Sequence, residues 1–246
     1  MATGKTHPRH FRLYADGMDL SGDTRGVSSF GMTYQEDAVT GWSEGVENYT
    51  LGQLSIFING YSAVFNNATG RSFTELKDNE SYVVCLPMGI RAAPAYGDPA
   101  FAATLQARGI TVTGDGPVTL ETDFLGVDAA VTTLPTNAFG VVQYPLTAIT
   151  ATTTGTQVDH GAATTNGCIG YLQVTATSSG NYAIIIEHSD TGAWGGEEAT
   201  LLTFAANASA VGGEALAATG TVNKYTRIVA TRTGGTCSIG CVLVRL

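Results

Sequence analysis

Short runs of Thr, Val, Ile and Tyr, closed by Gly, Asn or Asp, recur along the whole chain. β-Branched and aromatic residues favour strands, whereas the residues that close the runs favour turns. The pattern therefore predicts an all-β protein with very little helix. A chain of 246 residues can form one large β domain or two smaller ones.

The first half of the chain predicts a hairpin followed by several strands. The hairpin turns at Asp16-Gly17, because glycine adopts the positive φ that a tight turn requires. Further strands are expected at 26–35, 51–65 and 81–90, and the second of these is apolar enough to be buried on both faces. A strand pair at 109–114 and 117–126 is expected to turn at Asp115-Gly116, with one covered face formed by Val118, Leu120, Thr122 and Phe124.

One short flanking helix is predicted over about residues 98–108. Asp98 is suited to cap this helix, Pro99 to occupy its first turn and Gly109 to end it. Phe101 and Leu105 are four residues apart, which places them on one face. That face is expected to pack on a sheet.

The composition shifts to Thr, Ala and Gly at about residues 148–166, where we place a boundary between domains 1–150 and 151–246. The second domain is predicted to be a small Ig-like β-sandwich, because turn residues recur at intervals near ten residues. Its five expected strands are 168–177, 181–189, 199–206, 221–232 and 237–246.

Charged residues make up 13% of the chain, about half the usual share. Such a surface suits packing against neighbours, although a Thr-rich monomeric β-sandwich fits the same composition. The net charge of −9 argues against a general nucleic-acid binder, because affinity for phosphates comes from Lys and Arg. Residues 1–150 carry 8 basic and 15 acidic residues, or −7, so the acidity is concentrated there.

No catalytic motif, cofactor-binding motif or metal-ligand spacing is recognisable, so we expect no catalytic residue, no cofactor and no metal site. The four cysteines do not form a disulfide framework and are expected to be buried free thiols. The start of the chain has no apolar leader segment, and no apolar run is long enough to span a membrane, so synthesis in the cytoplasm is expected.

Two segments carry exposed aromatic candidates. The polar loop between the strands at 26–35 and 51–65 holds Trp42 and Tyr49 and is long for a loop without a partner, which suggests a subunit interface. The alternative is that Trp42 folds back onto its own domain. In the second domain, Trp194 lies in a loop and is a candidate to stack on a sugar.

The segment LYADGMDLSGDTRGVS at 13–28 resembles the N-terminal hairpin of phage tail tube proteins. The order that follows is also similar, with GYSAVF, YVVCLP, GDPAFAATLQARGITVTG and a strand pair. The resemblance covers about residues 10–145, and the later part is similar to domains appended to virion structural proteins. The glycine-bearing loop at 35–50 departs from the regular family pattern.

The resemblance implies a tail-tube-like β-sandwich or split barrel in a virion tail. Copies of the chain would form homohexameric rings that stack into a tube and contact other tail proteins, while DNA passes through without specific binding. Acidic residues would then face the channel, with Asp115, Glu121 and Asp123 as candidates. The alternative is that these three are ordinary solvated residues.

Two other functions stay open on the sequence. A capsid decoration or cement protein would also be β-rich and structural, but would bind at capsid symmetry axes. A carbohydrate-binding adhesin would act through residues 160–246, with Trp194 as its stacking residue.

Overall fold

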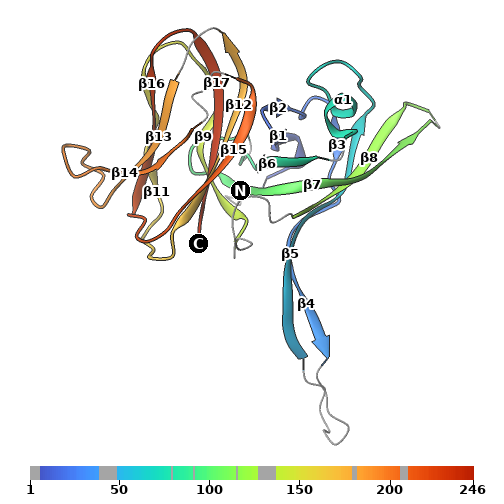
Figure 1. Cartoon of the computed structure of the whole chain (residues 1–246), viewed down its shortest axis with the longest axis horizontal. Coiled ribbons are helices and arrows are strands. Elements are labelled where there is room, and N and C mark those ends of the chain that lie inside the picture. Colours follow the sequence, from blue (N-terminus) through green and yellow to red (C-terminus); the bar gives the residue numbers. More distant parts are fainter. Residues whose placement is uncertain are drawn as a thin grey trace, which may run out of the picture.

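The structure is a computed structural model that describes residues 6–38, 49–78, 80–90, 92–114, 116–126, 137–178, 182–205 and 210–246. These residues are almost wholly antiparallel β-structure, which confirms the predicted class (Figure 1). Within them, two sheets of twelve and five strands are formed.

The large sheet joins both halves of the chain. Its main path runs β15-β12-β17-β9-β7-β6-β1-β2, while β8, β5, β4 and β3 continue from β7. The bounds are β1 Tyr14–Ala15, β2 Met18–Asp19, β3 Thr24–Gly26, β4 Ser29–Ala38, β5 Tyr49–Val64, β6 Ser81–Pro87, β7 Pro99–Thr113, β8 Thr119–Gly126, β9 Phe139–Ile149, β12 Cys168–Ser178, β15 Gly212–Ala218 and β17 Thr236–Arg245.

The five-stranded sheet is formed by strands from the second half of the chain. It consists of β10 Thr153–Thr154, β11 Val158–Asp159, β13 Tyr182–Ser189, β14 Ala199–Thr203 and β16 Tyr225–Arg232. Buried side chains from both sheets form one core between them, so this part is a sandwich (Figure 1). All five strands predicted for the second half are present, as β12, β13, β14, β16 and β17, whereas β9, β10, β11 and β15 were not predicted.

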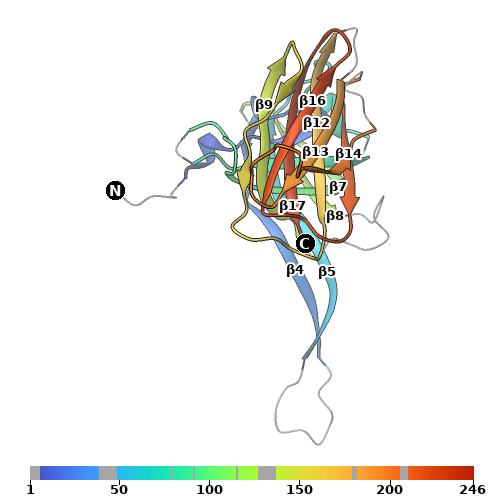
Figure 2. The same cartoon turned by 90° about the vertical axis from the view of Figure 1, so that its left-hand side faces the viewer.

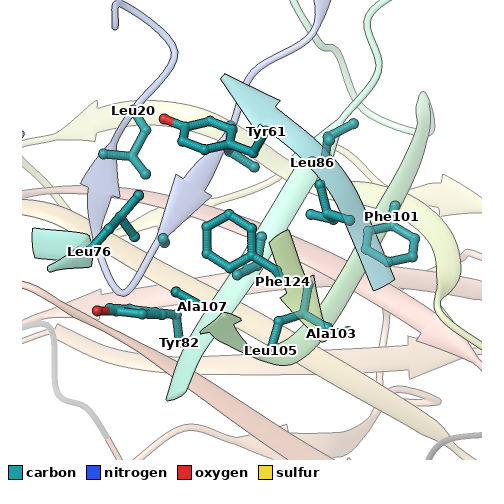
Figure 3. Close-up of a cluster of buried hydrophobic side chains, with 14 of the residues drawn as sticks. Leu20, Tyr61, Leu76, Tyr82, Leu86, Phe101, Ala103, Leu105, Ala107 and Phe124 are labelled. Carbon is teal, nitrogen blue, oxygen red and sulfur yellow. The ribbon is translucent and has the colours of Figure 1, made fainter. Parts of the chain in front are cut away.

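A second hydrophobic core is formed by side chains from the first half of the chain. It gathers Leu20, Tyr61, Leu76, Tyr82, Leu86, Phe101, Leu105 and Phe124, which are at most 3% exposed (Figure 3). Alternation along β8 is confirmed, since Leu120, Thr122 and Phe124 are buried, although Val118 just before the strand is 43% exposed. The prediction that the 51–65 strand is buried on both faces is wrong, because the described part of β5 buries only alternate side chains.

The helix predicted over 98–108 is wrong, because residues 99–108 form the first part of β7. Alanines are good helix formers, but here they fit a strand that is buried between its neighbours, with β6 on one side and β8 and β9 on the other. Pro99 is the first residue of the strand, where a missing N–H is tolerated, and Gly109 takes φ +67° at a register shift. The described helix is instead α1 Ser72–Leu76, with a 3-10 turn at Pro8–His10.

The predicted Asp16-Gly17 turn is confirmed and also joins the two halves. The Gly17 N–H donates to Gln173 Oε1 on β12 at 2.6 Å, and Gln173 Nε2 donates to the Val83 carbonyl on β6 at 2.7 Å. Asp16 Oδ1 in turn accepts from the Val83 N–H at 2.8 Å. Beside these bonds, a small core with Tyr14, Cys85 and Tyr171 packs between the halves, while the division at residue 150 stays a prediction.

Asp16 makes stability depend on pH. Burial raises the pKa of its carboxyl from 3.8 to about 6, the bond from Val83 lowers it, and the nearby Glu80 raises it. Because the folded protein holds the proton of Asp16 more tightly than the unfolded chain does, this carboxyl stabilises the fold at low pH. We therefore expect the free energy of unfolding to fall as the pH rises from about 4 to about 6, and to level off above pH 6. After allowance for partial exposure, the loss is about 1 kcal/mol.

Asp16→Asn keeps an oxygen that can accept from the Val83 N–H but cannot ionise. We expect this variant to be about 1 kcal/mol more stable than wild type at pH 8. Its free energy of unfolding should not fall as the pH rises from about 4 to about 6. Denaturant unfolding at a series of pH values measures both effects. A variant that retains the wild-type decline would show that another group causes it.

All four cysteines are free and buried, as predicted. Burial raises the pKa of Cys85 to about 12 and that of Cys237 to about 11.

Candidate assembly surface

A two-stranded arm leaves the body of the protein. Beyond the pair Phe57 and Leu125, β5 has no partner but β4 among the described residues. The arm projects away from both cores in two perpendicular views (Figures 1 and 2). The paired part from Met32 to Ala38 is roughly 20 Å long at about 3.4 Å per residue.

The base of the arm is fixed by aromatic packing. The ring centroid of Phe30 on β4 lies 5.4 Å from that of Phe101 and 6.3 Å from those of Phe11 and Phe139. Two residues further along β4, Met32 Sδ accepts from the Ala138 N–H at 3.1 Å. These contacts hold the direction of the arm relative to β7 and β9.

Along its projecting part the arm has two unpaired backbone edges within the described residues. A lone two-stranded hairpin is marginally stable in water, and open strand edges pair readily with other strands. Tyr34, opposite Leu54, is 46% exposed. The arm is therefore suited to being completed by another chain.

Of the three acidic candidates for the channel wall, Asp115 lies outside the described residues. Glu121 and Asp123 are exposed on the same face of β8. Asp123 Oδ1 accepts from the Gly60 N–H at 2.6 Å, and Arg108 on β7 lies directly opposite Asp123. The described face thus includes a positive charge, and its orientation toward a channel stays a prediction.

Of the two aromatic loop candidates, only Tyr49 is among the described residues. Trp42 lies outside the described residues, and Tyr49 is the first residue of β5, with its side chain not described. The strands extend further into the predicted loop than expected, since β4 reaches Ala38 and β5 begins at Tyr49. The polar residues Gln35 to Asp37 gave no strand signal, so the sequence did not reveal this part of the arm.

Trp194 lies in the loop between β13 and β14, as predicted, and its indole is already engaged. The Arg227 guanidinium lies 4.0 Å from the ring centroid, and the indole N–H donates to Gln157 Oε1 at 2.6 Å. Arg227 also pairs with Glu187 at 2.8 Å. One face of the ring is covered, so a sugar would have to stack on the other face, and this role stays a prediction.

Among the residues that the structure describes, no group of three or more His, Cys, Asp or Glu side chains is placed to hold a metal ion. In the same residues no helix has the length and apolar character needed to cross a membrane.

Comparison with known proteins gives little more. No family model matches the chain, and no curated protein matches it. Among solved structures, the Dit protein of phage SPP1 is similar at 12% sequence identity and a TM-score of 0.29, over 96% of this chain and 99% of that one. Dit is described as a paradigm of the hub adsorption apparatus in phages that infect Gram-positive bacteria. A similarity this low carries no argument about the present chain.

Proposed function

We propose that the chain is the subunit of a phage tail tube, which forms stacked homohexameric rings around a channel for DNA. It acts by assembly and not by catalysis, in the tail of the virion and together with other tail proteins. The observation that carries this proposal is the β4–β5 arm, which leaves the body with two unpaired edges in the described residues.

The arm supports self-assembly because an open edge is stabilised when a neighbouring strand completes it. Identical copies in a ring can each offer an arm and receive one, and rings that stack head to tail form an open-ended tube. The motif order over residues 10–145 supports the tail tube among such assemblies.

The charge of the chain supports passage of DNA. A net charge of −9 repels phosphates and offers few Lys and Arg contacts, so DNA would move through without specific binding. We assign the face that carries Glu121 and Asp123 to the channel wall.

Negative-stain electron microscopy of the concentrated, purified chain tests the proposal. Six-fold rings or tubes are expected. Stable monomers would contradict it, and stable trimers would favour a capsid decoration protein. Binding on a glycan array that Trp194→Ala abolishes would favour an adhesin.

A further inference from the structure

An acidic groove lies between α1, the β1–β2 turn and the start of β15. Its volume is about 880 Å³, and five carboxylates line it together with a single cation, Arg71, among the described residues. The five carboxylates belong to Asp16, Asp19, Glu75, Asp78 and Glu80. We call this surface the acidic groove.

Part of this charge is held in place by local bonds. Glu75 Oε1 accepts from the Gly70 N–H at 2.7 Å, and Asp19 Oδ1 accepts from the Ser21 N–H at 3.0 Å. Asp78 pairs with Lys77 at 2.6 Å, but this pair is exposed and contributes little. The carboxylates therefore repel one another without a matching set of cations.

A basic groove is lined by the N-terminal segment and by residues that follow β2, and it shares no lining residue with the acidic groove. Its volume is about 380 Å³, and its charged and titratable lining residues are His7, Arg9, Arg12 and Arg25, with no carboxylate among the described ones. Residues 1–15, which supply His7, Arg9 and Arg12, contain no acidic residue.

The two grooves do not neutralise each other within one molecule. Among the described residues the ion pairs join Lys77 to Asp78, Lys224 to Asp159 and Arg227 to Glu187, and none crosses between the grooves. Opposite charge on two separate surfaces of one chain is the arrangement that pairs copies through unlike surfaces.

We propose that the acidic groove of one copy binds the basic groove of a second copy, so that the two surfaces form a contact between subunits. This inference rests on the proposed self-assembly and names the surfaces that direct it. Charge complementarity chiefly sets partner orientation and the rate of association, while the arm supplies backbone pairing.

Charge reversal tests the proposal with two variants. Asp78→Lys with Glu80→Lys neutralises the acidic groove, whose five carboxylates and one cation give −4, and Arg9→Glu with Arg25→Glu changes the basic groove from +3 to −1. These four side chains are exposed, so both variants are expected to fold. In each variant alone the attraction between the two grooves is lost, and the concentration needed for assembly should rise about tenfold or more.

Mixing the two variants lets an unchanged acidic groove face an unchanged basic groove at every other contact, and assembly should return part of the way to the wild-type concentration. Asp190→Lys with Glu198→Lys, in the β13–β14 loop, is the matched control for the acidic-groove variant, because it raises the net charge by the same amount outside both grooves. It should assemble as wild type does. Sedimentation and electron microscopy at equal protein concentrations give the readout.

The outcomes separate the two proposals. If wild type does not assemble under any condition, the proposed function is wrong. If wild type and the two charge-reversal variants, each on its own, assemble alike, the chain polymerises but the grooves are not its contact. The groove pairing would also be overturned if each charge-reversal variant fails to assemble on its own and mixing the two does not restore assembly.

Discussion

Replacing residues 35–53 with Asn-Gly is expected to abolish ring and tube formation while leaving a folded monomer. Tyr34 and Leu54 are paired across the arm, so a two-residue turn can connect them directly. The base keeps Phe30 and its aromatic contacts, so the core is unaffected. The variant loses the projecting strands that we assign to the contact between copies.

Electron microscopy and sedimentation measure assembly of this variant, and thermal unfolding checks its fold. A change in melting temperature below about 4 °C would correspond to roughly 1 kcal/mol or less for a chain of this size. Assembly by the shortened chain at the wild-type concentration would show that the arm is not the assembly element. A large fall in melting temperature would show instead that the arm supports the monomer.

Gly17→Ala is expected to destabilise the protein by about 3 kcal/mol or more. Gly17 has φ +79°, where a side chain costs about 1–2 kcal/mol. An added Cβ would lie 2.3 Å from the Val174 carbonyl oxygen and 2.4 Å from the Gly212 backbone nitrogen. Both contacts are backbone, so relief requires the turn to move away from β12 and β15, with a further cost of about 1–3 kcal/mol.

Gly161→Ala is the matched control, because Gly161 has φ +80° with nothing within 4 Å of an added Cβ. It should lose only about 1–2 kcal/mol. Urea unfolding of both variants gives the two free energies. Equal losses would mean that the clash at Gly17 has no cost and that the turn does not fix how the halves dock.

The strands of this protein could be predicted where local pattern and tertiary setting agree. Alternation along β8 and the Asp16-Gly17 turn are local signals, and the structure follows them. β7 shows the limit of such signals. Its alanines favour a helix in isolation, and only the neighbours β6, β8 and β9, which come from distant sequence, make it a strand.

The assembly surface was less predictable for a similar reason. A long polar loop with Trp42 suggested an interface, but the length and direction of the arm depend on how Phe30 packs against Phe101 and Phe139. The acidic groove gathers Asp16 and Glu80, which are far apart in the chain, so its charge could not be read from sequence spacing.

The four buried thiols can be used as chemical probes of local opening of the folded chain. A thiolate reacts with an alkylating reagent only when it is exposed, so each labelling rate reports how readily the surrounding structure opens. Cys85 lies where the two halves meet and Cys237 lies in the sandwich core, so their rates compare two regions of one molecule. Slower labelling in polymers than in free subunits would measure, region by region, how much neighbouring copies reduce local opening.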